Sequence, residues 1–125
     1  FTGRGFRFVL ELKCKNLNQN IKVKQLGCNV KINRRTEASI QTLTTSSVAD
    51  TVVTFAKPFF AGDASLGVGA NLKPHIEVTL LNPNAADVIE ITNITNTSFT
   101  LNITQPQYQT SRFARDFTFV AIGYG

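Results

Sequence analysis

DFTFVAIGYG (116–125) closes the chain with alternating apolar and polar residues, and five short segments of similar character precede it. These segments are TVVTFAKPFF (51–60), ASLGVGA (64–70), HIEVTLLN (75–82), DVIEITN (87–93) and SFTLNIT (98–104). Short strands with turns about every ten residues are typical of two packed antiparallel sheets. None of the segments has helical periodicity. We therefore predict an all-β fold, with an antiparallel β-sandwich over residues 51–125.

The composition fits one folded domain, because 42% of the 125 residues are hydrophobic and 17% are charged. No apolar run approaches the roughly 18 to 20 residues that a membrane-spanning helix needs. The chain contains no Met and begins at Phe1, so we expect it to be a piece of a longer protein.

The front of the chain predicts a two-strand hairpin. One face of its first strand carries Phe6, Phe8, Leu10, Leu12 and Cys14. A second strand follows over 21–32, with a bulge expected near Gln25 where the alternation slips by one residue. Residues 1–35 are thus predicted to be an N-terminal β-hairpin, either of this domain or of an upstream β domain. Residues 36–50, rich in Thr and Ser, are predicted to be a linker.

Charge is distributed unevenly along the chain. Residues 1–35 hold nine Lys or Arg against Glu11 alone, whereas the remaining 90 residues hold four basic and seven acidic side chains. A polyanion such as DNA or lipopolysaccharide phosphate is one partner that such a front suggests. The basic residues alternate with apolar ones, however, which favours a solvated strand face. No nucleic-acid-binding motif accompanies them, so we expect no nucleic-acid partner.

Several segments resemble the C-terminal module of phage tail-tip host-specificity proteins, the central tail fibre proteins. The likeness rests on the order of apolar positions, on Phe59 and Phe60 after Pro58, and on the segments RGFRFVLELK (4–13), ITNITNTSFTLNI (91–103) and GYG (123–125). That module is related in pattern to the small sandwich of H-type lectins. The resemblance implies a lectin-like sandwich that forms a homotrimer at the distal tail tip or fibre of a virion. It also implies synthesis in the host cytoplasm, contacts with other tail proteins and a receptor on the bacterial surface.

The strand order predicts which loops face outward. If six strands of 51–125 alternate in direction, the connections 57–63, 82–86 and 104–116 share the end farthest from the N-terminal tether. Amide, tyrosine and arginine side chains suit hydrogen bonding and stacking on sugars or on a protein loop. The candidate receptor-binding residues are Asn82, Asn84, Gln107, Tyr108, Gln109 and Arg112. Phe59, Phe60 and Asp63 also belong to these loops, and we expect at least one of the two Phe side chains to be buried.

The residues that catalysis requires are not present in a recognisable pattern. His75 is the only histidine, the acidic residues are scattered, and no nucleophile motif or calcium-loop pattern occurs. We predict that the chain is not an enzyme and uses no cofactor or metal.

The two cysteines are predicted to be unpaired. In a hairpin that turns near residues 17 and 18, Cys14 and Cys28 are separated by roughly seven positions of about 3.3 Å each, beyond the reach of a disulfide. Two buried thiols would be consistent with synthesis in a reducing cytoplasm.

Asn93, Asn96 and Asn102 each begin an N-x-S/T sequon. These would be glycan acceptors in a secreted eukaryotic protein and ordinary turn or strand residues in a phage protein, which is the interpretation that we favour.

Together these observations favour a receptor-binding module of a phage tail fibre or tail tip that attaches the virion to its bacterial host. Two alternatives remain at this point: a structural trimerisation cap of the fibre, or a secreted sugar-binding lectin. The receptor is either a polysaccharide or an outer-membrane or pilus protein.

Overall fold

The computed structural model describes residues 7, 9–13, 15, 22–27, 32–64, 69, 71–108 and 111–125. The chain divides into two compact units, residues 1–30 and 31–125. The described part of the chain contains no helix long and apolar enough to cross a membrane.

In the first unit, none of the described residues belongs to a strand, and all of them are exposed. Leu10 and Leu12, the described residues of the predicted apolar face, are each 51% exposed, and Val9 is 77% exposed. An isolated two-stranded ribbon gains little from burial. The hairpin over 1–35 stays a prediction, because much of it, including Cys14 and Cys28, falls outside the described residues.

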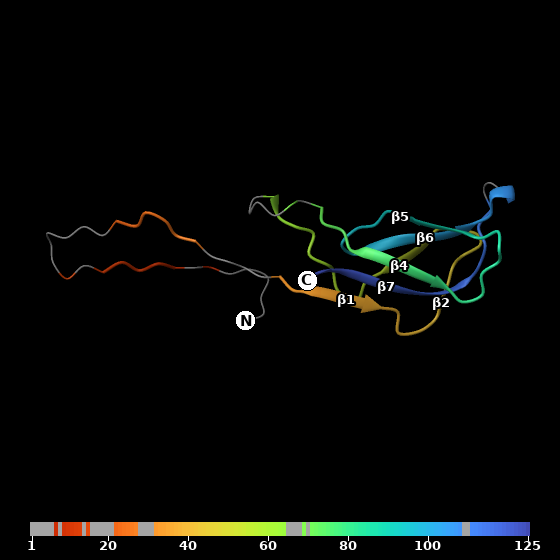
Figure 1. Cartoon of the computed structure of the whole chain (residues 1–125), viewed down its shortest axis with the longest axis horizontal. Helices are drawn as coiled ribbons and strands as arrows, with labels where there is room; N and C mark the ends of the chain where they lie inside the picture. The colour runs from red at the N-terminus through yellow and green to blue at the C-terminus, as the bar shows by residue number, and fades with distance from the viewer. Residues whose placement is uncertain are drawn as a thin grey trace. The chain divides into compact units, whose positions relative to one another are not determined.

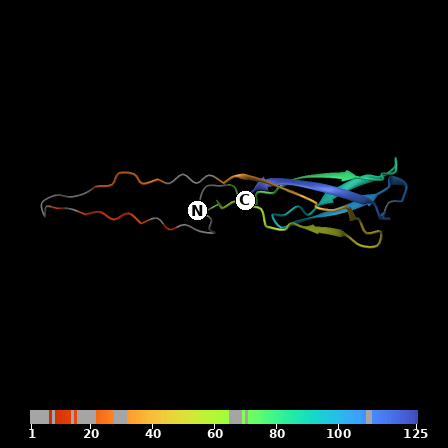
Figure 2. The ribbon, with the colours of Figure 1, turned by 90° about the horizontal axis from the view of Figure 1, so that it is seen from below.

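The second unit contains two antiparallel sheets that face each other (Figure 1). The first sheet contains β1 (Arg34–Ala38), β2 (Leu43–Thr44), β4 (His75–Leu80) and β7 (Asp116–Tyr124). The second sheet contains β3 (Thr51–Thr54), β5 (Val88–Thr92) and β6 (Ser98–Thr104). Figure 2 shows the same strands from below, with β3 and β7 in different layers. The prediction of an all-β fold with antiparallel sheets is confirmed, and the arrangement is consistent with a β-sandwich.

β7 is the central strand of the first sheet. Ile122 faces Thr36 of β1 on one side and His75 of β4 on the other. β1 and β2 form one edge of this sheet, and residues 39–42 bulge between them, opposite residues 118 and 119. The bulge leaves Ile40 fully exposed.

The predicted linker over 36–50 is therefore wrong, because much of it forms this edge. The sequence signal was misleading since the half-buried positions of β1 are charged: Arg35 and Glu37 pair with each other at 2.8 Å. Inward-pointing charges are one way in which edge strands avoid pairing with other chains.

The core fills the space between the two central strands. Phe99, Leu101 and Ile103 alternate along β6, and Phe117, Phe119 and Ala121 alternate along β7. These positions are at or near zero exposure, because each lies on the inward side of a strand with neighbours on both edges.

The predicted strand over 64–70 is absent at its two described residues, Ala64 and Gly69. Gly62 turns the chain with a positive φ of 87°, and a Cβ there would meet the Gly69 carbonyl oxygen at 1.7 Å. The chain thus folds back on itself here instead of crossing the sheet. Between β3 and β4, none of the described residues of 55–74 belongs to a strand.

The missing strand changes which loops share an end. We call the end at which residues 32 and 33 lead into β1 the proximal end, and the opposite one the distal end. The pairings place the loops 45–50, 81–87 and 105–115 at the distal end. Figure 1 shows the C-terminus beside the start of β1, with the blue loop that follows β6 at the far end of the unit.

The loop 57–63 lies at the proximal end, contrary to the prediction. The Phe59 backbone N–H donates to the Asn96 carbonyl at 2.7 Å, and the Phe60 N–H donates to that of Tyr124 at 2.6 Å. Phe59 is buried, as expected for at least one of the pair, and Phe60 is half-buried.

Candidate binding surface at the distal end

Three loops make up the distal end, and a buried carboxylate joins two of them. The side chain of Asp87 is only 1% exposed, although it lies at a loop terminus. Its oxygens accept hydrogen bonds from Arg115 Nε at 2.6 Å and Nη2 at 3.0 Å, and from Gln105 Nε2 at 2.9 Å. The backbone N–H of Asn84 donates a fourth, at 2.8 Å. Asp87 therefore holds 81–87 against 105–115.

Hydrogen bonds from Arg115 hold the pKa of Asp87 well below its ordinary range, and those from Gln105 and Asn84 add to the effect. The same pairing raises the pKa of Arg115. Both groups are therefore charged at neutral pH, and the fork of the guanidinium fits the carboxylate through two parallel bonds.

Thr45 attaches the third loop. Its buried hydroxyl donates to the Phe113 carbonyl at 2.8 Å and accepts from the Arg115 backbone N–H at 2.8 Å. The Thr45 backbone N–H donates to the Arg115 carbonyl at 2.9 Å. The loop 45–50 is thus joined to 105–115 by side-chain and backbone bonds together.

Arg112, a predicted receptor-binding residue, is already paired. Its Nη2 donates to Asp50 Oδ1 at 2.5 Å, and Asn102 Nδ2 donates to the same oxygen at 2.9 Å. The hydrogen bond from Asn102 and then that from Arg112 lower the pKa of Asp50. Arg112 therefore fixes a loop to the outer face of the β3-β6-β5 sheet and has its charge compensated there.

Four of the other predicted residues are exposed on two of the loops. Asn82 and Asn84 lie on 81–87, and Gln107 and Tyr108 lie on the 3-10 helix η2 (Pro106–Tyr108). Gln109 falls outside the described residues. The Oδ1 of Asn84 accepts from the Ala86 backbone N–H at 3.1 Å, so this side chain also shapes its own turn.

Tyr108 is the aromatic side chain of this surface. It is 53% exposed, and its ring centroid lies 5.9 Å from that of Phe113. Phe113 in turn contacts Arg115, whose Cζ lies 5.7 Å from the Phe113 ring centroid. The exposed ring is therefore supported from behind by a residue that belongs to the locked loop.

Gln105 and Arg115 were predicted to belong to an outward-facing loop, but their pairing with Asp87 was not predicted from the sequence. Asp87 counted only as a scattered acid, and its partners Gln105 and Arg115 are 18 and 28 positions away. Contacts of that separation depend on the strand order. A signal was nonetheless present: a lone Asp next to the Asn-Pro-Asn turn, facing a loop with two Arg.

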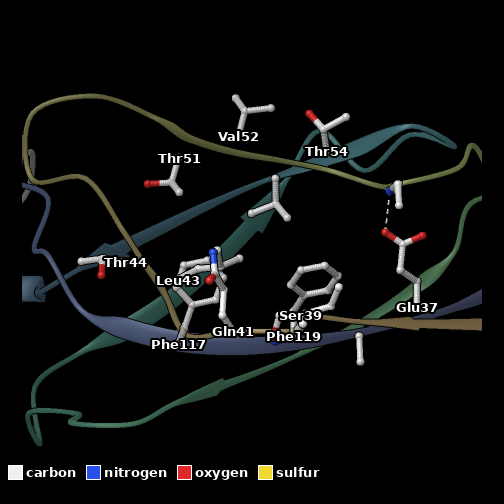
Figure 3. A pocket seen from close by; sticks show the side chains of 14 residues that line it. Glu37, Ser39, Gln41, Leu43, Thr44, Thr51, Val52, Thr54, Phe117 and Phe119 are labelled. Carbon is white, nitrogen blue, oxygen red and sulfur yellow. Dashed lines mark hydrogen bonds between the residues drawn. The ribbon is translucent and has the colours of Figure 1, made fainter.

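A hollow lies between the free edges of the two sheets, and none of its lining residues belongs to the three distal loops (Figure 3). This seam groove has a volume of about 710 Å³. Its floor is apolar and consists of Leu43, Val53, Phe117 and Phe119, and its rim includes Glu37, Gln41, Thr44, Thr51 and Thr54. Ile40 and Val52, both exposed, border it. Of its floor residues, Val53, Phe117 and Phe119 are themselves buried, so the exposed apolar side chains at the seam groove are Ile40 and Val52.

His75 is an exposed strand residue that lies 3.4 Å from the exposed Glu77. No three His, Cys, Asp or Glu side chains of the described part of the chain gather as metal ligands.

The three sequons differ in their surroundings. Asn102 is buried on β6, with its Nδ2 bonded to Asp50, and its Oδ1 has no hydrogen-bond partner among the described residues. Asn96 donates to the Phe59 carbonyl at 3.3 Å, while Asn93 is exposed with φ of 49°. A glycan on Asn102 would not fit this fold.

No protein-family model and no curated protein matches this chain.

Proposed function

We propose that this chain is the receptor-binding module of a phage tail fibre or tail tip, and that it attaches the virion to the bacterial surface through its distal end. The observation that carries the proposal is the distal end itself. Loops tied together by Asp87, Thr45 and Arg112 expose amides and a tyrosine at the end opposite the incoming chain. The sequence resemblance to tail-tip proteins supplies the biological context.

The physical reason for favouring recognition is that the surface is ordered in advance. Binding loses affinity when loops and side chains must be immobilised, at about 0.5–1.5 kcal/mol for each flexible side chain. The contacts of Asp87 and Thr45 already fix the loop backbones. A tyrosine supported by Phe113 offers a large contact area with few torsions to freeze.

Three copies on one fibre axis would convert weak single contacts into firm attachment. A second contact made by a linked copy is effectively intramolecular, which raises overall avidity by about 100-fold to 10,000-fold when the geometry allows it. A shallow polar surface is adequate under those conditions.

The test is to label susceptible and resistant bacteria with the fluorescent module. A Gln107→Ala/Tyr108→Ala variant should lose most labelling, because it removes exposed contacts and leaves the Asp87 lock in place. Arg112 is left unchanged, since its removal would release Asp50. Lys73→Ala, on an exposed residue of the proximal end, is the matched control.

Labelling of susceptible cells only, lost in the double variant and kept in the control, would support the proposal. If Lys73→Ala abolishes labelling and the double variant retains it, the module is mounted in the opposite orientation. If the unmodified module labels no susceptible strain, the proposal is wrong.

The seam groove favours a second role, that of a structural cap that holds the fibre as a trimer. The exposed side chains of Val52 and Ile40 beside the seam groove suit contact with another copy. Light scattering at micromolar concentration should give a trimer for the unmodified chain. Val52→Asp should shift it to monomer, whereas Val88→Asp, on the opposite edge strand β5, should not. A monomeric mass for the unmodified chain would exclude this role.

The secreted-lectin alternative receives less support. It predicts glycosylation of the sequons, and Asn102 is buried and bonded to Asp50.

A further inference from the structure

We infer that the ligand of the distal end is an uncharged polysaccharide. The inference rests on the proposed function and deepens it by naming the class of receptor. It follows from the charged residues of the distal end, where both Arg side chains are already paired with Asp side chains.

The loops 45–50, 81–87 and 105–115, with the first residue of β7, contain five charged residues. These are Asp50, Asp87, Arg112, Arg115 and Asp116. The two residues of this region that lie outside the described part, Gln109 and Thr110, are uncharged. The sequence alone therefore gives the complete list.

Both cations are used inside the protein. Arg115 is held by Asp87 through two nitrogens, and Arg112 is held by Asp50. Asp116 accepts a hydrogen bond from Thr44 Oγ1 at 2.7 Å. Two Arg against three Asp leave this end with a formal charge of −1.

An anionic ligand would have to compete with these internal pairs. Drawing Arg115 away would leave Asp87, at 1% exposure, as a buried charge without its partner, which is strongly unfavourable. Drawing Arg112 away would release Asp50 beside the ligand, with repulsion between like charges. Phosphorylated or carboxylated surface polymers are thus disfavoured at this end.

The exposed groups match hydroxyls instead. An amide side chain offers both donors and acceptors, and a sugar hydroxyl also does both. Asn82 and Gln107 provide exposed amides, and Tyr108 provides a ring on which a sugar face can stack. A protein receptor would bring charged loops against a surface with no uncompensated cation and would leave those charges unpaired.

The experiment measures binding of the module to susceptible bacteria between about 0.01 M and about 1 M salt, over which the Debye length falls from about 30 Å to about 3 Å. We expect the affinity to change by less than about threefold, because no intermolecular charge pair contributes. Periodate oxidation of the cells should abolish labelling, and protease treatment should not. Soluble alginate, an anionic polysaccharide, should not compete.

Asp50→Asn provides the matched gain-of-charge variant. It frees the Arg112 guanidinium while keeping a side chain that can bond to Asn102. Soluble alginate should now compete with labelling by this variant, and that competition should weaken as salt rises, whereas its binding to the cells alone should stay insensitive to salt.

Three other outcomes would each contradict the inference, and they differ in what they mean for the attachment function. Labelling that falls at least about tenfold with salt and is blocked by alginate means an anionic glycan. Labelling lost to protease and kept after periodate means a protein receptor. Both results reject the neutral glycan and leave the attachment function standing. No labelling of untreated susceptible cells rejects the attachment function and this inference with it.

Discussion

The two ends of the sandwich are closed by different physical means. At the proximal end, Phe59 packs edge-to-face on Phe55 with ring centroids 5.0 Å apart, and Arg35 lies 4.0 Å above the Phe59 ring. At the distal end, Asp87, Arg115 and Thr45 tie the loops through hydrogen bonds and an ion pair. One end is closed by apolar burial and the other by a polar network.

The difference teaches how a small domain can offer a binding surface. A loop that is closed by burying its aromatic side chains cannot use those side chains to contact a ligand. The polar lock is made by Asp87, Arg115, Gln105 and Thr45, and it leaves the neighbouring amides and Tyr108 exposed. The lock also requires every one of its partners, because a buried polar group without a partner costs more than a bond gains.

The largest effect should come from the aromatic end. Phe59→Ala should lower the free energy of unfolding by about 3–5 kcal/mol, since it empties a site enclosed by Phe55 and by Gly123, whose added Cβ would meet Phe59 at 2.6 Å. Denaturant unfolding measures the loss. Phe60→Ala, at the half-buried neighbour, should lose clearly less. Equal losses would contradict the assignment of Phe59 as the closing side chain.

The next effect should come from the centre of the polar lock. Asp87→Ala removes the acceptor of Arg115, Gln105 and the Asn84 N–H together, so we expect a loss smaller than that of Phe59→Ala and larger than that of one hydroxyl. Thermal unfolding measures it. Proteolysis should cut the loop 105–115 of this variant sooner than that of the unmodified chain. Unchanged cleavage would mean that the loop is held by other contacts.

The same carboxylate predicts how stability depends on pH. The pKa of Asp87 is depressed in the folded state, so its contribution is fully present above the unfolded value of about 3.9 and is lost as pH falls below it. Unfolding measured from about pH 7 down to about pH 3 should show a steeper loss for the unmodified chain than for Asp87→Ala. Parallel curves would show that Asp87 does not carry the acid sensitivity.

A smaller effect is expected from the third loop. Thr45→Val keeps the shape of the side chain and leaves the Arg115 backbone N–H without its acceptor, at a cost of about 1–3 kcal/mol. Thr45→Ser should restore most of the loss, because the hydroxyl is retained. If the serine variant is as unstable as the valine variant, the methyl group and not the hydroxyl is what matters.

The smallest change in stability should come from the exposed surface. Tyr108→Ala should alter the free energy of unfolding by less than about 0.5 kcal/mol, as surface substitutions usually do. Its effect should appear in cell labelling and not in the melting temperature. A large loss of stability would show that the Tyr108–Phe113 contact belongs to the lock.

Much of the fold was predictable from alternation alone. The inward positions of β6 and β7 follow a period of two, and the structure buries Phe99, Leu101, Phe117 and Phe119 accordingly. The same criterion failed for β1, whose half-buried positions are Arg35 and Glu37, and for Ala64 and Gly69, the described residues of the strand predicted over 64–70. In such segments the alternation of apolar and polar residues does not indicate the structure, because contacts between distant parts of the chain decide it.

The site was predictable in composition and not in arrangement. By itself, the sequence determined that the fold is all-β, which residues alternate into the core, and which charges the distal loops contain, since these depend on residue type and local spacing. Only the tertiary structure decided that the loop 57–63 lies at the proximal end and that Arg112 and Arg115 are neutralised by Asp50 and Asp87. Those outcomes depend on which strands pair, and strand pairing brings together residues that are far apart along the chain.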